Sequence, residues 1–254
     1  MTSTPEFVIV IPARYASQRL PGKALLDIGG KSLLEHVWNR ASASAAVEVV
    51  IATDDQRIVR AAEAFGANVV LTSAEHTCGS DRIAECAGSM QWPADRVIVN
   101  LQGDEPLMPP ACLDQVAQLL NADATADAAT LYWPVENIGE ISDPNAVKVV
   151  VGQGGNALLF SRAAIPHPRN FPSHAEAFEA GFTWQRHLGL YAYRKASLDR
   201  FARTHPTPLE QAEHLEQLRF LETGGRIVAA QACQHIPAGV DTPADLERVR
   251  KLFI

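Results

Sequence analysis

The stretch FVIVIPARYASQRLPGK, residues 7–23, joins an apolar run to a loop that carries three cations. Phe7–Ile11 is apolar and rich in β-branched residues, which predicts a strand, and Arg14, Arg19 and Lys23 lie on the Pro- and Gly-containing loop that follows. In an open α/β sheet, ligands bind outside the carboxyl ends of the strands, and two guanidiniums with an ammonium suit a polyphosphate. The alternative interpretation is a solvated basic surface loop.

The whole chain has the composition of an ordinary folded protein. Its 254 residues allow one large α/β domain or two small ones, and 47% hydrophobic with 20% charged residues excludes disorder and long membrane spans. The formal net charge of −7 opposes a general attraction to nucleic acid or to an anionic membrane. We therefore expect neither as a partner, and the basic loop is a local positive island.

Neither the N-terminus nor the cysteines indicate an oxidising or secreted setting. Met1–Glu6 is short and polar, without a basic segment followed by an apolar secretory core, so we expect a cytoplasmic protein. No CxxC pair is present, which argues against a zinc site and against a disulfide framework. We expect mostly reduced, partly buried thiols at all four cysteines, Cys78, Cys86, Cys112 and Cys233.

Apolar β-branched runs alternate with helical patterns through the first half of the chain, which predicts parallel βαβ units. Ser32–Glu35 is a capping-box pattern that opens a helix towards Ser42, and Gly66 is placed to close a second helix that starts near Asp55. The strands expected in this half are Phe7–Ile11, Val47–Ala52, Val69–Leu71 and Val97–Leu101.

The pattern changes from Ala128 onwards. A turn at Gly152–Asn156 predicts a hairpin between two short strands, and Leu209–Glu222 reads as one amphipathic helix whose polar side chains face solvent. Pro166–Phe182 has little periodicity and is either a mobile lid or a surface connection. The strands expected here are Thr130–Val135, Val147–Val151, Leu158–Phe160, His187–Tyr193 and Ile227–Ile236, before a final helix from Pro243.

Two aspartates follow predicted strands. Asp104 comes after the strand at Val97, at the rim that faces the basic loop, where it either holds Mg²⁺, pairs with the loop or is a turn residue. Asp241 directly precedes Thr242, which suits the N-cap of the last helix, with Asp245 at its N3 position. Asp241 is thus either a turn residue or a second metal carboxylate.

Other polar residues have both a functional and a structural interpretation. Gly79–Arg82 offers a glycine and a Ser80 N-cap at a predicted helix start, where backbone N–H groups favour an anion. Arg82 either clamps a carboxylate or pairs with Glu85 on the helix surface. His187 reads from its strand position as a histidine with its hydrogen bonds satisfied.

Taken together and in order, these fragments closely resemble the 3-deoxy-manno-octulosonate cytidylyltransferase (CMP-Kdo synthetase) family. Each fragment is weak alone, but their order and spacing are specific, and the match covers nearly the whole chain. The fragments that carry the resemblance are Ile11–Ser17, Arg19–Lys23, Ala52–Asp54, Gly79–Arg82, Val99–Pro106, Asn145–Lys148, Arg186–Gly189, Leu215–Arg219 and Val240–Pro243.

The resemblance implies a Rossmann-like nucleotide-diphospho-sugar transferase fold of the α/β class, a mixed, mostly parallel sheet with helices on both faces. It implies one cytidylyltransferase domain over residues 1–254, with a hairpin and dimerisation excursion around 130–195, and a homodimer. It also implies Mg²⁺-dependent transfer of CMP from CTP to the anomeric hydroxyl of 3-deoxy-manno-octulosonate (Kdo), with release of pyrophosphate, for lipopolysaccharide synthesis.

Site residues follow from the resemblance by position. The residues expected to carry catalysis are Lys23, Arg14, Asp104 and Asp241, of which Asp104 and Asp241 would bind Mg²⁺. Those expected to contact the nucleotide are Pro12, Ala13, Arg14, Arg19, Lys23, Thr77, Cys78, Gly79 and Gln102. Those expected around the sugar acid are Arg82, Gln102, His187, Tyr191, Glu216 and Gln217.

One position departs from the family pattern, and other activities share the chemistry. Cys78 stands where relatives usually carry serine, and because a thiol is a weak donor, we expect backbone contacts to the base there. The alternative functions are an 8-amino-Kdo or acylneuraminate cytidylyltransferase and a non-catalytic nucleotide-sugar sensor.

Overall fold

The structure is a computed structural model that describes residues 6–16, 19–76 and 78–253. Its strands are β1 (Phe7–Ala13), β2 (Asp27–Ile28), β3 (Lys31–Ser32), β4 (Glu48–Thr53), β5 (Asn68–Leu71), β6 (Val97–Asn100), β7 (Ala128–Pro134), β8 (Lys148–Val151), β9 (Ala157–Ser161), β10 (Gln185–Arg194) and β11 (Ile227–Gln231). Its helices are η1 (Lys23–Leu25), α1 (Leu33–Ser42), α2 (Gln56–Ala64), α3 (Gly79–Ser89), α4 (Pro110–Asn121), α5 (Gly139–Ser142), α6 (His174–Glu179), α7 (Lys195–Arg203), α8 (Pro208–Glu213), α9 (Gln217–Glu222) and α10 (Pro243–Arg250).

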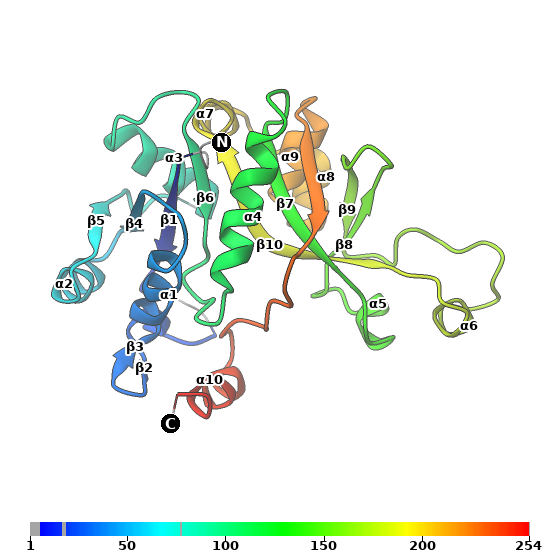
Figure 1. Ribbon diagram of the computed structural model, residues 1–254, viewed down its shortest axis with the longest axis horizontal. Coiled ribbons are helices and arrows are strands. Elements are labelled where there is room, and N and C mark those ends of the chain that lie inside the picture. The colour runs from blue at the N-terminus through cyan, green and yellow to red at the C-terminus, as the bar shows by residue number, and fades with distance from the viewer. Residues whose placement is uncertain (1–5, 17–18, 77, 254) are drawn as a thin grey trace.

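A mixed, mostly parallel sheet runs through the molecule in the order β11-β7-β10-β6-β1-β4-β5 (Figure 1). Strand β1 pairs in parallel with β4 on one side and β6 on the other, and β5 continues the parallel half. Strand β10 runs antiparallel to both β6 and β7. The predicted α/β class and mixed sheet are confirmed.

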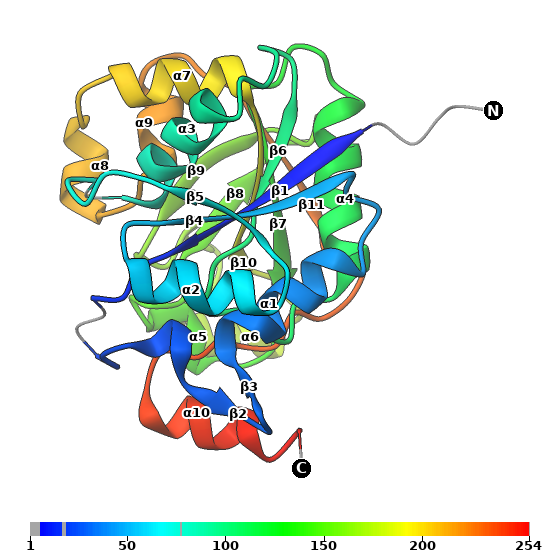
Figure 2. The same ribbon diagram turned by 90° about the vertical axis from the view of Figure 1, so that its left-hand side faces the viewer.

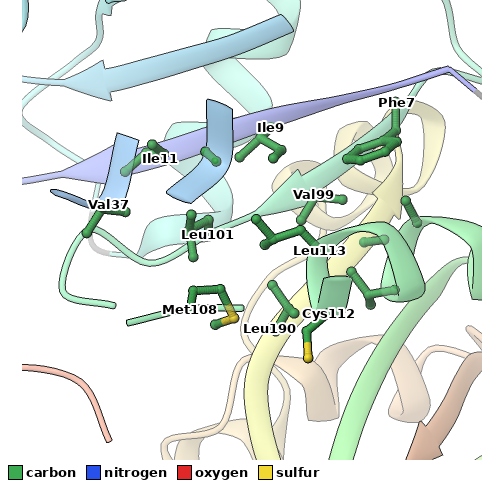
Figure 3. Packing of buried hydrophobic residues seen from close by; sticks show 14 of the residues in the cluster. Phe7, Ile9, Ile11, Val37, Val99, Leu101, Met108, Cys112, Leu113 and Leu190 are labelled. Carbon is green, nitrogen blue, oxygen red and sulfur yellow. The ribbon is translucent and has the colours of Figure 1, made fainter. Parts of the chain in front are cut away.

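Alternation along β1 explains why helices cover both faces of this sheet. Phe7, Ile9 and Ile11 point to one face, where they pack in a cluster with α1, α2 and α4 (Figure 3). Val8 and Val10 point to the other face and pack in a second cluster with α3, α7 and α9. Figure 2 shows α1 and α2 on one side of the strands and α3 and α7 on the other. A strand buried on both faces reads as a continuous apolar run, as this one does.

Several predicted helix boundaries are confirmed by their caps. Ser32 is the N-cap of α1 and its hydroxyl accepts a hydrogen bond from the backbone N–H of Glu35 at 3.1 Å. Helix α2 begins after Asp55 and is followed by Gly66, whose φ is +83°. Thr242 and Asp245 form a reciprocal capping box at the start of α10.

The predicted single helix over Leu209–Glu222 is wrong. The chain forms two short helices, α8 and α9, separated at His214, which has a left-handed φ of 51°. Arg162 explains the break, because its guanidinium donates to the backbone carbonyls of Glu213 at 2.7 Å and His214 at 3.4 Å. The carbonyls at the end of α8 are thus satisfied by a residue far away in the sequence. Helical periodicity does not reveal such a contact.

The last strand is shorter than the predicted Ile227–Ile236. β11 ends at Gln231, because the side chain of Gln115 in α4 takes over the next backbone groups: it donates to the carbonyl of Gln231 at 2.7 Å and accepts from the N–H of Cys233 at 2.8 Å. Residues 232–242 then form an extended segment, the β11–α10 linker, that leads to the last helix.

The excursion between β7 and β10 contains the predicted hairpin and a small apolar cluster. β8 and β9 pair antiparallel, with a turn closed by the N–H of Gly155 on the carbonyl of Gly152 at 2.9 Å. The segment 166–182 contains α6, whose Ala177 packs with Trp184 in a cluster beside β7. Figure 1 shows β8, β9, α5 and α6 at the end of the molecule opposite α2 and β5.

Helix α10 packs against the small β2–β3 ribbon. Leu246 and Val249 lie in one cluster with Ile28 and Leu33, and the Arg250 guanidinium donates to the carbonyl of Asp27 at 3.0 Å. The C-terminal helix is thereby fixed to the N-terminal part of the chain. Among the described residues, no helix combines the length and the apolar character that crossing a membrane requires.

Leu113→Ala tests the cluster between α4 and the sheet. Leu113 is completely buried, so truncation should lower the free energy of unfolding by about 2–5 kcal/mol through lost burial and a cavity. The matched control is Leu252→Ala, since Leu252 is 62% exposed and its truncation should change stability by less than about 0.5 kcal/mol. Urea unfolding followed by circular dichroism measures both; equal effects would contradict the described packing.

Candidate active site

The carboxyl ends of parallel strands β1 and β6 meet at one edge of the sheet, and their following loops lie against each other. The N–H of Leu101 donates to the carbonyl of Val10 at 3.1 Å, which carries the pairing past the last residue of β6. Gly103 then crosses the end of β1 so closely that a Cβ there would lie 2.9 Å from the carbonyl oxygen of Pro12. Glycine permits this approach and places the next residue, Asp104, beside the basic loop.

Asp104 and Asp241 share one cation. The Lys23 Nζ lies 2.6 Å from Asp104 Oδ2 and 3.0 Å from Asp241 Oδ1, so one ammonium bridges the two carboxylates. The β11–α10 linker delivers Asp241 to this point, because the N–H of Val240 donates to the carbonyl of Asp104 at 2.8 Å. A Cβ at Gly239 would lie 2.8 Å from that same carbonyl oxygen, so this approach also requires glycine.

The environment keeps Lys23 charged. Burial works to lower the pKa of Lys23, but the charges and hydrogen bonds of Asp104 and Asp241 outweigh it and raise the pKa above its ordinary value. Arg19 adds a second cation at the outer side, with its guanidinium 3.2 Å from Asp241 Oδ2 and 67% of its side chain exposed. The pair is therefore surrounded by positive charge from the basic loop.

A first cavity opens at this point, between the basic loop and the loop after β6. It contains Arg14 and Lys23, two of the three cations predicted to suit a polyphosphate, together with Pro12 and Ala13, which are predicted to contact the nucleotide. Its lining consists of Pro12, Ala13, Arg14, Ala16, Lys23, Ala24, Gln102, Gly103 and Asp104.

A second cavity adjoins the first and shares Gln102 with it. Antiparallel pairing of Tyr191 with Asn100 makes the first half of β10 extend beyond the carboxyl end of β6, which brings in His187 and Tyr191. The break between α8 and α9 supplies the opposite wall. The lining consists of Ser80, Asn100, Gln102, His187, Gly189, Tyr191, Tyr193, His214, Leu215, Glu216 and Gln217.

A buried ion pair holds the α8–α9 wall in place. The Arg219 guanidinium makes a two-pronged contact with the Glu210 carboxylate, donates to the carbonyl of Thr204 at 3.1 Å and lies 3.9 Å above the Phe201 ring. Both charged groups are buried, so this pairing satisfies charges that would otherwise be costly. It fixes the turn on which Glu216 stands, and Glu216 accepts a hydrogen bond from the Ser80 hydroxyl at 2.8 Å.

Neutral polar groups line the floor of the second cavity. Burial lowers the pKa of His187 to about 3, so its imidazole is uncharged at neutral pH, with Nε2 3.1 Å from Thr130 Oγ1. Burial and the neighbouring Tyr193 raise the pKa of Tyr191, which therefore remains a phenol. These groups can form hydrogen bonds to hydroxyls but supply no charge.

Four polar side chains of this cavity were not among the predicted site residues: Ser80, Asn100, Tyr193 and His214. Asn100 Oδ1 is buried and has no hydrogen-bond partner among the described residues. A ligand that donates a hydrogen bond to this oxygen would satisfy it. A signal was present in β6, since an amide at the end of an apolar strand marks the ligand-binding edge of the sheet. His214 carried no such signal, because its position depends on the helix break.

Arg82 lies outside the lining of both cavities. Its side chain is fully buried, with Nη2 2.6 Å from Asp54 Oδ2 and Nη1 hydrogen-bonded to the Thr72 hydroxyl. The proposed surface pair with Glu85 is wrong, since Glu85 instead accepts from the N–H of Ser73 at 2.9 Å. Arg82 points inward from α3 and links Asp54, which follows β4, to Thr72, which follows β5. The carboxylate that Arg82 binds therefore belongs to the protein itself.

The start of α3 differs from the prediction. The N-cap is Cys78, whose Sγ accepts from the N–H of Asp81 at 3.4 Å, and Ser80 instead donates to Glu216. A Cβ at Gly79 would lie 3.9 Å from the Pro12 ring, so Cys78 and Gly79 stand close to the first cavity. Burial and the charge of Glu216 raise the pKa of the Cys78 thiol, which stays protonated. Thr77 lies outside the described residues.

The donor set fits a Mg²⁺ ion that shares its ligands with a substrate. In the described part of the chain, no group of three or more His, Cys, Asp and Glu side chains could hold a metal. The two carboxylates, Asp104 and Asp241, already meet on one cation at Lys23. Mg²⁺ typically binds through one or two carboxylates and takes its remaining ligands from phosphates and water, which matches this pair.

Comparisons with known proteins agree on one family. The Cytidylyltransferase family profile matches residues 8–227. The 3-deoxy-manno-octulosonate cytidylyltransferase of Cellvibrio japonicus (strain Ueda107) is 50% identical over 249 residues, which is 97% of this chain and 98% of that protein. The enzyme of the same name from Pseudomonas syringae pv. syringae (strain B728a) is 49% identical over 251 residues, 98% and 99% of the two chains.

Solved structures agree as well. A CMP:2-keto-3-deoxy-manno-octonic acid synthetase complexed with CTP superposes with a TM-score of 0.87 at 41% identity, covering 98% of both chains. A 4-diphosphocytidyl-2C-methyl-D-erythritol synthase superposes with a TM-score of 0.65 at 15% identity over 98% of both chains, which shows the common fold alone.

Asp54→Ala tests whether Arg82 serves the fold. Removal of Asp54 would leave the fully buried guanidinium of Arg82 without its carboxylate, and the free energy of unfolding should fall by about 3–5 kcal/mol. The control is Glu6→Ala, which removes the 72% exposed partner of Arg96 and should cost about 1 kcal/mol or less. Urea unfolding compares the two; similar small losses would argue against a structural clamp.

Proposed function

The chain belongs to the 3-deoxy-manno-octulosonate cytidylyltransferase family, and from that premise we propose how the two adjoining cavities perform the reaction. The enzyme transfers CMP from CTP to the anomeric hydroxyl of Kdo and releases pyrophosphate. The first cavity takes the nucleotide triphosphate and the second takes the sugar acid. We infer that the product serves lipopolysaccharide synthesis, as the use of Kdo implies.

One observation carries this assignment: Gln102 lines two adjoining cavities, and the first of them also contains Lys23 and Asp104 of the lysine-bridged carboxylate pair. Transfer between two substrates requires that their reacting atoms be held close together in line. Cavities that share a wall residue meet that requirement, because a triphosphate in one places its α-phosphate next to an acceptor in the other. Separate cavities on different faces would not.

The basic loop supplies the electrostatic part of the mechanism. Attack on the α-phosphate concentrates negative charge on the transferred group and on departing pyrophosphate, so catalysis depends mainly on positioning and charge stabilisation. Arg14 and Lys23 line the first cavity, and Arg19 stands at its outer side. We assign all three to the phosphates, with backbone around Ala13, Cys78 and Gly79 framing the base and ribose.

Asp104 and Asp241 would hold Mg²⁺. When bound, the ion supplies Lewis-acid stabilisation of phosphate charge and activation of the Kdo hydroxyl. The carboxylates are close enough to share one cation, as their common contact with Lys23 demonstrates. Phosphate oxygens offer Lys23 an alternative anionic partner, so the ammonium can exchange carboxylate contacts for substrate contacts.

The second cavity fits a polyhydroxylated acceptor. His187 and Tyr191 are neutral, and Glu216, Gln217 and Asn100 add carboxylate and amide groups that form hydrogen bonds to hydroxyls. These residues come from three separate parts of the chain, so they surround the acceptor on several sides. We assign Gln102 to both substrates because it lines both cavities.

We propose that the protein is a homodimer and that the excursion around residues 130–195 contributes to the contact. Leu158 and Leu159 support this proposal, because both lie on the short hairpin strand β9 and are 62% and 37% exposed. Apolar side chains on a strand of this kind favour association with another surface.

A pyrophosphate-release assay that crosses CTP, ATP, GTP and UTP with Kdo, 8-amino-Kdo and N-acetylneuraminate tests the function. We expect release with CTP and Kdo, and much slower release with the other combinations. Preference for 8-amino-Kdo or for neuraminate would reassign the acceptor. Binding of CTP without pyrophosphate release from any acceptor would instead indicate a nucleotide-sugar sensor.

Replacement of either proposed metal carboxylate should reduce turnover strongly. Asp104→Asn and Asp241→Asn keep side-chain size but remove the charge that would hold Mg²⁺, so kcat should fall at least about 10²-fold. Steady-state rates at saturating Mg²⁺ measure the effect. Asp95→Asn, at an exposed loop position, is the control and should retain wild-type turnover. Near-normal turnover in either site variant removes that residue from the metal role.

Lys23→Ala should weaken CTP binding and slow the single-turnover rate, because the variant lacks the ammonium that we assign to the phosphates. Lys31→Ala is the control, since that lysine is about half exposed and pairs with Glu35 on the surface of α1. Calorimetry measures CTP affinity, and rapid quench measures the rate. Unchanged values of both for Lys23→Ala would disprove its phosphate assignment.

A further inference from the structure

The fold brings together two cysteines that are far apart in the sequence. Cys112, in the first half of α4, and Cys233, in the β11–α10 linker, have their Sγ atoms 3.8 Å apart. Neither belongs to a CxxC pattern, and the sequence gives no reason to connect them. The reaction proposed above uses neither thiol.

The two thiols differ sharply in access. Cys112 is fully buried, in the packed cluster that also holds Leu113 and Leu190 (Figure 3), whereas Cys233 is exposed. Burial raises the pKa of Cys112 to about 11, which keeps it protonated at neutral pH. An oxidant that arrives from solvent therefore meets Cys233 first.

Hydrogen bonds between α4 and the β11–α10 linker keep the two cysteines close together. Gln115 fixes the linker through the carbonyl of Gln231 and the N–H of Cys233, at 2.7 and 2.8 Å. Cys112 Sγ also lies 3.7 Å from the carbonyl oxygen of Gln234. One turn of α4 thus keeps the exposed thiol next to the buried one, and bond formation requires the sulfurs to approach from 3.8 Å to about 2.05 Å.

We propose that Cys112 and Cys233 are a reversible redox pair, in which hydrogen peroxide converts two thiols into a disulfide that ties the β11–α10 linker to α4. The Cys233 sulfur first attacks peroxide, giving a sulfenic acid and one water. The Cys112 thiol then attacks that sulfur, forming the S–S bond and releasing a second water. Two thiols are oxidised and one peroxide is reduced, and a dithiol such as dithiothreitol reverses the step by exchange.

The modification matters because of what the linker carries. The segment after Cys233 runs to Val240, which is hydrogen-bonded to Asp104, and then to Asp241. A covalent tether at Cys233 restricts the same backbone that delivers the second carboxylate. Formation of the bond itself depends only on the two cysteines and stands whether or not the proposed catalytic roles do.

The test treats the full chain with equimolar hydrogen peroxide and maps cysteines by mass spectrometry. We expect the mass of the intact protein to fall by two hydrogens, and a peptide that links Cys112 to Cys233 to appear. Dithiothreitol should reverse both changes. Hydrogen exchange over residues 232–240 should be slower in the oxidised protein than in the reduced one. Cys86→Ser is the matched control, since Cys86 lies in α3 and its loss should leave disulfide formation unchanged.

Single variants separate the two roles. Without its resolving partner in Cys112→Ala, Cys233 should accumulate a sulfenic acid that dimedone traps, whereas Cys233→Ala should leave Cys112 unreacted. Circular dichroism checks that both variants are folded. The proposal is overturned if wild-type Cys233 goes on to sulfinic acid without joining Cys112, or if the only disulfide formed links Cys233 residues of two molecules.

Discussion

The site depends on the neutralisation of two carboxylates by one ammonium. Asp104 follows β6, Asp241 precedes α10 and Lys23 stands in η1, so three distant segments meet at a single charge contact. Two carboxylates this close repel each other unless a cation lies between them. The arrangement therefore favours a cation at this point, and the Lys23 ammonium supplies it.

The adjoining cavities differ in chemistry: Arg14 and Lys23 of the basic loop line the first, and among the described residues no cationic side chain from that loop lines the second. The first presents cations from the loop after β1, whereas the floor of the second consists of an uncharged imidazole and phenol from β10. Antiparallel insertion of β10 beside β6 produces this division, since it adds a polar strand to an edge that is otherwise built from parallel βα units. On the proposed assignment, the phosphate chain and the sugar would be recognised by different physical means in two cavities that share Gln102.

Local signals made much of the fold and part of the site predictable. The caps at Ser32 and Thr242, and the continuous apolar run of β1, depend on neighbouring residues alone and could be identified from the sequence. The helix break at His214 could not, because it depends on hydrogen bonds from Arg162, which follows β9 and lies some fifty residues earlier in the sequence. The buried clamp of Arg82 depends on similar long-range contacts, and the predicted roles of the site residues rest on resemblance to the family.

Asp241 lies after β11, the last described strand of the central sheet. In the described part of the chain, every strand of this sheet ends by Gln231, whereas Asp241 and α10 follow later in the sequence. A prematurely terminated chain would contain the sheet and most of both cavities, yet lack the complete charge cluster and leave Ile28 and Leu33 uncovered by their C-terminal partners. The charge cluster therefore requires the chain beyond the last strand of the sheet, and chains truncated before α10 would expose apolar side chains that favour aggregation.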